Sequence, residues 1–191
     1  MQKKAYRKAF LQERVTGSWE VERQKILEHI QSFFVGEIWD SVGFYWPIKF
    51  EIDIVDLMIR LRQERRISQL ALPRIIERQM AFFTWDGCSP MGLGSMGIEE
   101  PLNGDEIVPS LLLVPCVAMD RDGIRLGYGG GYFDRYLAKY PQTKTLGIIT
   151  SKFIVDQLPR NQFDRALNGM ISENGVEWFK KSADVFVGAQ G

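Results

Sequence analysis

The hydrophobic and polar positions at the start of the chain follow a helical period. Residues 3–14 contain no glycine or proline and are predicted to form a helix. Residues 16–18 (Thr-Gly-Ser) interrupt it, and Ser18 is expected to cap a second helix. The first turn of that helix carries Glu20 and Glu22, which are favourable near the positive end of a helix dipole. The pattern therefore predicts two N-terminal helices.

Beyond them, short strand-like runs alternate with helical ones. Residues 111–114 are all apolar, which is typical of a strand buried on both faces of a parallel sheet. The other predicted strands are 38–46, 67–72 (ending before Pro73), 79–85 and 146–149, and the later helices are about 52–62 and 134–140. This alternation predicts an α/β fold, with a single three-layer domain in which helices flank a central, mostly parallel sheet.

Two stretches lack this periodicity. Residues 88–103 are rich in glycine, proline and serine and are predicted to form a long loop, of a kind that often has a functional role. The C-terminal end is polar and closes with Gly-Ala-Gln-Gly. We expect the α/β domain to span residues 1–175 and a polar tail to span 176–191.

The charge balance limits the partners. The 191 residues hold 24 Lys+Arg and 24 Asp+Glu, a formal net charge of zero, so no overall field attracts nucleic acid. No apolar run approaches the roughly 20 residues of a membrane helix, and no apolar signal core follows the N-terminus. We expect a cytoplasmic, monomeric protein without nucleic-acid or membrane partners, in which a local basic cluster holds any anionic ligand.

Cysteine and histidine are scarce. Cys88 and Cys116 are far apart and form no Cys-x-x-Cys motif, so both are expected to be reduced, buried side chains. The single histidine, His29, lies among helically spaced apolar residues and is expected to flank a buried helix face. Zinc enzymes and nucleophilic triads normally need a well-placed imidazole. The chemistry is therefore expected from carboxylates, basic side chains, aromatic rings and backbone amides.

The densest functional pattern is a glycine loop, in which four of the five residues 127–131 are glycine. Such a backbone can adopt positive φ and expose its amides to an anion, and a following helix adds its own free N–H groups. Arg125 and Arg135 flank the loop, and Asp134 is a candidate ligand for a cation such as Mg²⁺. The loop matches neither the P-loop nor the dinucleotide fingerprint, because Tyr132 and Phe133 follow its last glycine. An ordinary glycine-rich turn is the alternative.

A second pattern lies in the first predicted helix. Lys3, Arg7 and Arg14 fall on one side of this helix, together with Phe10. An apolar residue among them suggests that the stripe faces protein and reaches an anion held by the glycine loop. The alternative is a solvated helix whose long basic side chains cover its surface.

A third pattern follows the predicted strand that ends at Trp46. Glu51 comes shortly before a predicted helix, in a position where strand-to-helix loops build ligand sites in α/β proteins. An aromatic ring with a carboxylate suits a flat, nitrogen-rich ligand. The alternative is that Glu51 and Asp53 cap the helix. Residues 120–123 (Asp-Arg-Asp-Gly) are interpreted as a turn, because Ile124 occupies the place of a third calcium ligand.

The stretch 125–135, Arg-Leu-Gly-Tyr-Gly-Gly-Gly-Tyr-Phe-Asp-Arg, resembles the signature of the 5-formyltetrahydrofolate cyclo-ligase (methenyltetrahydrofolate synthetase) family. The resemblance covers about residues 3–173. Further features occur in the same order: Lys3-x-x-x-Arg7, Glu51-Ile-Asp53, Leu72-Pro73-Arg74, Gly97-Ile-Glu-Glu-Pro101 and Pro115.

The resemblance implies a single α/β domain and an enzyme that uses ATP and Mg²⁺. It would convert a reduced folate, 5-formyltetrahydrofolate, to 5,10-methenyltetrahydrofolate through an iminophosphate, releasing ADP and phosphate. By motif position, the residues that contact ATP would be Lys3, Arg7, Arg125, Leu126, Gly127, Tyr128, Gly129, Gly130, Gly131, Tyr132 and Phe133. Those that contact the folate would be Trp46, Glu51 and residues 128–132. Arg125 and Tyr132 would act at the reacting centre, and Asp134 and Asp164 would hold Mg²⁺.

The sequence departs from the family pattern at two aromatic residues. Phe133 stands where the family usually has tyrosine, and Phe163 where it often has histidine. Loss of a hydroxyl and an imidazole can alter proton handling or substrate preference. Two alternatives therefore remain: a binding module for folate or nucleotide without catalysis, and an ATP-dependent enzyme that acts on another N-formyl compound.

Overall fold

The structure is a computed structural model that describes residues 2–179. Four α-helices lie in this part of the chain: α1 (Gln2–Thr16), α2 (Glu20–Gly36), α3 (Val55–Gln63) and α4 (Tyr132–Lys139). A short 3₁₀ turn, η1, spans Ser151–Phe153. The two predicted N-terminal helices are confirmed. Ser18 does not cap α2, however, because the helix begins after Trp19, with no side-chain hydrogen bond at that cap.

The centre of the fold is an eight-stranded sheet in the order β13-β12-β10-β7-β1-β2-β3-β6. Its strands are β1 (Trp39–Gly43), β2 (Ile67–Ile76), β3 (Gln79–Trp85), β6 (Glu106–Ile107), β7 (Leu111–Pro115), β10 (Lys144–Ile148), β12 (Gly169–Ser172) and β13 (Gly175–Trp178). Strands β12, β10, β7, β1 and β2 pair in parallel, and antiparallel pairing is confined to the two ends. The predicted α/β fold with a mostly parallel sheet is confirmed.

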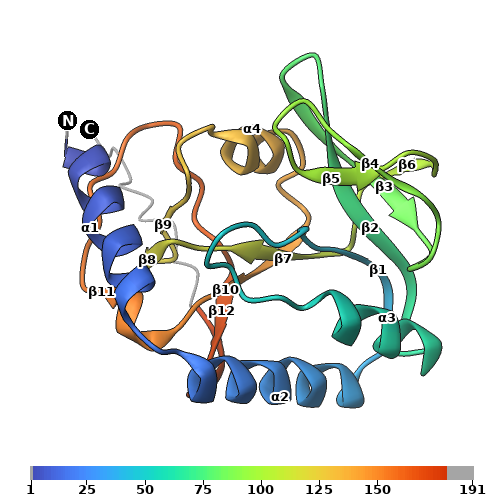
Figure 1. Cartoon of the computed structure of the whole chain (residues 1–191), viewed down its shortest axis with the longest axis horizontal. Helices are drawn as coiled ribbons and strands as arrows, with labels where there is room; N and C mark the ends of the chain where they lie inside the picture. The colour runs from blue at the N-terminus through green and yellow to red at the C-terminus, as the bar shows by residue number, and fades with distance from the viewer. Residues whose placement is uncertain (1, 180–191) are drawn as a thin grey trace, which may run out of the picture.

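Helices cover both faces of the sheet (Figure 1). On one face, α2 and α3 pack against Leu111 and Leu113 of β7; on the other, Leu112 and Val114 pack in a second cluster with Tyr136 and other residues of α4. Strand β7 is thus buried on both faces, as its continuous apolar run predicts. The result is the expected three-layer arrangement.

Two small sheets extend the second face. One contains β8 (Ala118–Asp120), β9 (Arg125–Leu126) and β11 (Ile154–Val155), and the other is a hairpin of β4 (Met91–Leu93) and β5 (Glu99–Pro101). The hairpin lies within residues 88–103, so the prediction of a loop without strands was wrong there. Its strands are only three residues long, too short to produce a visible alternation of polar and apolar positions.

Pro73 does not end its strand. Strand β2 pairs with β1 only as far as Ala71 and continues to Ile76 along β3. Beyond Ala71, β2 is therefore an edge on the β1 side, where a residue without a backbone N–H is tolerated. Other predicted limits also shift: β1 ends at Gly43, α3 begins at Val55, and α4 begins at Tyr132.

The sheet also extends past the predicted domain limit at residue 175. Strand β13 pairs antiparallel with β12 from Gly169↔Trp178 to Ser172↔Gly175, so at least the first residues assigned to the tail belong to the domain. Residues 180–191 lie outside the described part, and a tail there stays a prediction. Cys116 is buried as expected, but Cys88 is exposed, which contradicts the prediction. Within residues 2–179, no helix is long and apolar enough to cross a membrane.

Asp120 is a fully buried carboxylate that organises the small sheet. Its Oδ1 accepts hydrogen bonds from the backbone N–H groups of Asp122 and Ile124, each at 3.0 Å. Its Oδ2 accepts from the N–H of Leu158 at 3.1 Å and from Arg160 Nη2 at 3.0 Å. This confirms the predicted turn at residues 120–123.

We therefore expect Asp120→Ala to lower the free energy of unfolding by about 3 kcal/mol, since it leaves buried donors without an acceptor. Asp122→Ala, which removes an exposed partner of the same Arg160, should cost less than about 1 kcal/mol. Urea unfolding of both variants tests this expectation. Equal losses would show that the buried hydrogen bonds of Asp120 contribute little.

Candidate active site

A cavity of about 680 Å³ opens at the carboxyl ends of the central strands. Strand β1 has β2 on one side and β7 on the other. After β1 the chain first builds one half of the sheet and then, from β7 onward, the other half, so the strand order reverses between β1 and β7. Ligands of open α/β sheets bind in the crevice at such a switch point. Trp46, which follows β1, and Pro115, which ends β7, both line this cavity. The fold alone therefore places a binding site here.

Every site residue that the family resemblance implies lies on the wall of this cavity. They are Lys3, Arg7, Trp46, Glu51, Arg125, Leu126, Gly127, Tyr128, Gly129, Gly130, Gly131, Tyr132, Phe133, Asp134 and Asp164. These residues come from α1, the loop after β1, the glycine loop, α4 and the segment before β12. Their individual roles stay predictions.

The glycine loop connects β9 to α4 and shows why glycine is needed there. Gly129 has φ +103°, and Gly131, the residue that precedes α4, has φ +66°. Side chains rarely adopt these conformations. A Cβ at Gly127 would instead meet nothing within 4 Å, so this residue leaves open space at the cavity wall. The loop thus exposes backbone at Gly127 and presents the N-terminus of α4.

Two basic side chains attach helix α1 to the cavity wall, one to the glycine loop and one to the segment before β12. Arg7 Nε donates to the carbonyl oxygen of Gly127 at 2.6 Å, and Lys3 Nζ lies 2.6 Å from Asp164 Oδ1. The predicted stripe is only partly correct, because Arg14 lies outside the cavity lining. It is buried, stacks over Phe153 and donates to backbone carbonyls, including that of Cys116 at 2.8 Å.

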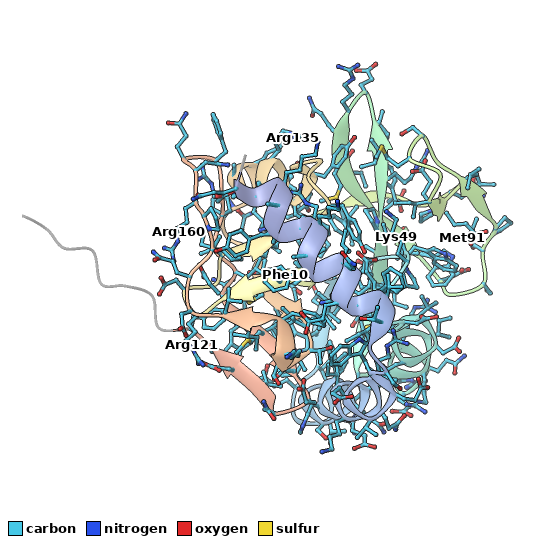
Figure 2. The ribbon with its side chains drawn as sticks, turned by 60° about the vertical axis from the view of Figure 1, so that its left-hand side comes forward. Phe10, Lys49, Met91, Arg121, Arg135 and Arg160 are labelled. Atoms are coloured by element: carbon cyan, nitrogen blue, oxygen red, sulfur yellow. The ribbon has the colours of Figure 1, made fainter. Side chains whose placement is uncertain are left out.

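Figure 2 shows α1 running across the front of the molecule. In this view Arg135 is above the N-terminal end of α1, and Met91 is at the right-hand edge. Arg135 donates to the carbonyl oxygen of Gly130 at 2.9 Å, and its guanidinium lies 4.8 Å from the centre of the Tyr132 ring. It therefore fixes the loop at Gly130, whereas Arg7 fixes it at Gly127.

Asp134 and Arg125 form a partly buried ion pair beneath the loop. Arg125 Nη2 lies 3.0 Å from Asp134 Oδ1, and the same oxygen accepts from the backbone N–H of Arg165 at 3.2 Å. The Arg125 side chain is 5 % exposed and its guanidinium lies 5.6 Å from the centre of the Phe133 ring. The aromatic residue at position 133 thus covers a buried cation rather than facing solvent.

The two carboxylates predicted to hold Mg²⁺ have suitable chemistry. Mg²⁺ is usually bound through one or two carboxylates, together with water and substrate phosphates. Asp134 and Asp164 supply such oxygens at one cavity wall. Each is paired with a cation, Arg125 or Lys3, and residues 2–179 contain no group of three or more metal-ligating side chains. The donor set fits a site that needs phosphate oxygens to be complete.

Glu51 and Trp46 line the same cavity as the glycine loop. Glu51 Oε2 accepts a hydrogen bond from the backbone N–H of Ile48 at 2.9 Å, whereas Asp53 bonds to the first N–H of α3, that of Val55. The capping alternative therefore holds for Asp53 but not for Glu51. Burial raises the pKa of Glu51 to about 7, against the opposing effects of the Ile48 hydrogen bond, Arg14 and Lys49.

Several cavity residues were missed from the sequence. Met96, Ile98 and Glu100 reach the wall from the β4–β5 hairpin, and Asn161 and Arg165 flank Asp164. Two signals pointed to the hairpin: the lack of periodicity over residues 88–103, and the family feature at residues 97–101, which was given no role in the site. The fold and site together define a class: an α/β protein with a cavity at the switch point of its sheet, lined by a glycine loop whose chemistry suits an anionic ligand.

Comparison with known proteins narrows this class. A model of the 5-formyltetrahydrofolate cyclo-ligase family matches residues 1–173. The chain belongs to this family, which confirms the resemblance and places the protein among enzymes of the ligase class.

Individual relatives agree with this assignment. The 5-formyltetrahydrofolate cyclo-ligase of Escherichia coli K12 is 29% identical over 147 residues, which cover 72% of this chain and 81% of the relative. The structure of the Aquifex aeolicus 5,10-methenyltetrahydrofolate synthetase has 28% identity and a TM-score of 0.80, covering 97% of this chain and 96% of that one. The Mycoplasma pneumoniae synthetase has 26% identity and a TM-score of 0.73, covering 91% and 99%.

The raised pKa of Glu51 predicts a specific dependence of stability on pH. Between its ordinary value of 4.5 and about 7, the folded state keeps the Glu51 proton while the unfolded state loses it. Stability from this group therefore falls as the pH rises through that window. Relative to the parent, Glu51→Gln should gain up to about 3 kcal/mol between pH 5 and pH 8.

Urea unfolding at both pH values measures this gain. Glu37→Gln, the same change at an exposed carboxylate, is the control and should show no such gain. A stability difference between Glu51→Gln and the parent that is the same at pH 5 and pH 8 would contradict the prediction.

Proposed function

We propose that the protein catalyses the ATP- and Mg²⁺-dependent cyclisation of 5-formyltetrahydrofolate to 5,10-methenyltetrahydrofolate, with release of ADP and phosphate. Family membership supports the cyclo-ligase reaction. The nucleotide, the metal and the intermediate are supported by the chemistry of the cavity. The single observation that carries the proposal is that one cavity is lined both by the glycine loop with its cations, here called the anion end, and by Trp46 with Glu51, here called the ring end.

The anion end combines the glycine loop with cations. Lys3, Arg7 and Arg125 all line the cavity beside the loop. A triphosphate bound there would receive hydrogen bonds from loop amides and charge-assisted hydrogen bonds from these side chains. Such fixed positive groups stabilise the charge that develops during phosphoryl transfer, so the protein needs no nucleophile of its own.

The ring end combines Trp46 with the carboxyl group of Glu51. Trp46 packs edge-on against Trp85 at a ring-centroid distance of 6.0 Å, which fixes its orientation. The bicyclic ring of a reduced folate offers N–H donors to Glu51 and a flat face to Trp46. In this arrangement the formyl group lies toward the glycine loop and Tyr132.

The proposed reaction has two steps. The formyl oxygen attacks the γ-phosphorus of ATP; a C–O–P linkage forms, the bond to the β-phosphate oxygen breaks, and ADP leaves. Nitrogen N10 of the folate, which does not carry the formyl group, then attacks the activated formyl carbon and closes the ring. The C–O bond breaks, phosphate takes the former formyl oxygen, and the proton of the attacking nitrogen passes to phosphate or solvent. Arg125 and Tyr132 both line the cavity and are proposed to act at this reacting centre.

Asp134 and Asp164 are proposed to hold Mg²⁺ together with phosphate oxygens. The ion would neutralise phosphate charge. Asp134 forms an ion pair with Arg125, and Asp164 forms one with Lys3. A bound triphosphate would therefore compete with the two carboxylates for these cations.

The direct test is an ultraviolet assay for the methenyl product with ATP, Mg²⁺ and 5-formyltetrahydrofolate. We expect the product only when all three are present, with one ADP released for each product formed. Ligand binding by calorimetry without ADP would favour the non-catalytic module. ATP turnover with a different N-formyl compound, but not with the folate, would favour the other alternative.

Gly127 provides a second test of the nucleotide site. Because a Cβ there meets nothing within 4 Å, Gly127→Ala should leave the free energy of unfolding within about 0.5 kcal/mol of the parent. A triphosphate that approaches the loop backbone would meet the added methyl group, so the KM for ATP should rise about ten- to hundredfold.

Gly36→Ala is the matched control. A Cβ at Gly36, the last residue of α2, also meets nothing within 4 Å, and this position lies outside the cavity lining. Steady-state kinetics of Gly36→Ala should equal those of the parent. A parental KM for ATP in Gly127→Ala would argue against nucleotide contact at this part of the loop.

A further inference from the structure

Two sequence motifs that the proposed chemistry does not use meet at the cavity wall. Leu72-Pro73-Arg74 lies in β2, and Gly97-Ile-Glu-Glu-Pro101 leads into β5. They are joined by Glu100. Its Oε2 accepts a hydrogen bond from the backbone N–H of Ile75 at 3.3 Å, and its Oε1 lies 3.9 Å from Arg74 Nε.

Arg74 is itself held in place, because its guanidinium lies 4.5 Å from the centre of the Phe83 ring on β3. The Glu100 side chain is 19 % exposed, so it reaches across from the hairpin to the end of β2 with little access to solvent. Glu100 is therefore the polar link between the central sheet and the β4–β5 hairpin at this place.

The tip of the hairpin packs directly on the Glu100 carboxylate. The turn is closed by hydrogen bonds from Gly94 N–H to the Ile98 carbonyl and from Gly97 N–H to the Gly94 carbonyl, each at 2.9 Å. A Cβ at Gly94 would collide with Glu100 Oε2. A side chain at position 94 would therefore have to displace the Glu100 carboxylate from its place against the tip.

The same tip forms part of the cavity wall. Met96 and Ile98 line the cavity, and the hydroxyl of Tyr132 lies 3.6 Å from Met96 Sδ. The hairpin and α1 lie on opposite sides of α4 in Figure 1. Met96 thus contacts Tyr132, the first residue of α4, which directly follows the glycine loop.

We propose that Glu100 is a positioning residue that fastens the β4–β5 hairpin to β2, so that Met96 and Ile98 complete the folate side of the cavity beside Tyr132. The assignment of this side to the folate rests on the proposed function. The fastening itself depends only on the contacts of Glu100. Its backbone hydrogen bond to Ile75 is the principal link, since the distance to Arg74 is long for an ion pair.

Three variants separate these contributions. Glu100→Ala removes both links, so the KM for 5-formyltetrahydrofolate should rise about tenfold, while the KM for ATP changes less than about twofold. Glu100→Gln keeps a carbonyl oxygen for the Ile75 N–H and loses only the charge, so its kinetics should return to within about twofold of the parent. Leu93→Ala, on an exposed position of the same hairpin outside the cavity, is the control and should behave as the parent.

Amide hydrogen exchange over residues 91–101 gives a readout that does not depend on activity. Exchange should be at least about tenfold faster in Glu100→Ala than in the parent, with unchanged exchange in α2 and a native melting transition. Glu100→Gln and Leu93→Ala should show parental exchange.

The outcomes distinguish the two proposals. Unchanged hairpin exchange in Glu100→Ala overturns the positioning role, whatever the enzyme turns over. Faster exchange with an equal rise of both KM values overturns the assignment of this wall to the folate. If hairpin exchange is faster in Glu100→Ala but the parent protein makes no methenyl product, the fastening role is supported and the proposed function is rejected.

Discussion

The candidate site depends on the attachment of the N-terminal helix to a loop more than a hundred residues away. Arg7 donates to the Gly127 carbonyl and Lys3 pairs with Asp164, so α1 is joined to both the glycine loop and the segment that precedes β12. Arg14, further along α1, is buried and bonds to backbone carbonyls after β7. Arg14 thus fixes the C-terminal end of α1, and the N-terminal half of the helix places Lys3 and Arg7 at the cavity wall.

This arrangement explains how a chain of zero net charge can offer a site to a polyanion. The cavity wall holds basic side chains and carboxylates together, and Lys3 and Arg125 form ion pairs with Asp164 and Asp134. In the free protein these pairs limit the cost of keeping charges partly buried. A triphosphate would take over the cations and leave the carboxylates available to a divalent ion. Nucleotide binding and metal binding at this site would therefore be coupled, although neither requires a large overall field.

The sequence predicts the parts of the site that depend on local chemistry. The glycine loop, the apolar run of β7 and the carboxylate after β1 are visible because backbone freedom, burial on two faces and loop position follow from short stretches of sequence. The course of β2 past Pro73 is not visible, because it depends on where the neighbouring β1 ends. The burial of Arg14 and the place of the β4–β5 hairpin likewise depend on residues far away in the chain, which periodicity does not report.

Asp120 shows how such distant contacts position the site. Its Oδ1 closes the turn that leads into β9 and the glycine loop, and its Oδ2 holds Leu158 and Arg160, just before the segment that carries Asp164. One buried carboxylate therefore sets the relative position of two cavity walls, although it lies outside the cavity lining itself. The anion end does not follow a strand of the central sheet directly, as it does in many nucleotide-binding α/β folds. It is held by β9 of the small sheet, so the geometry of the proposed phosphate site is determined by that sheet's buried hydrogen bonds.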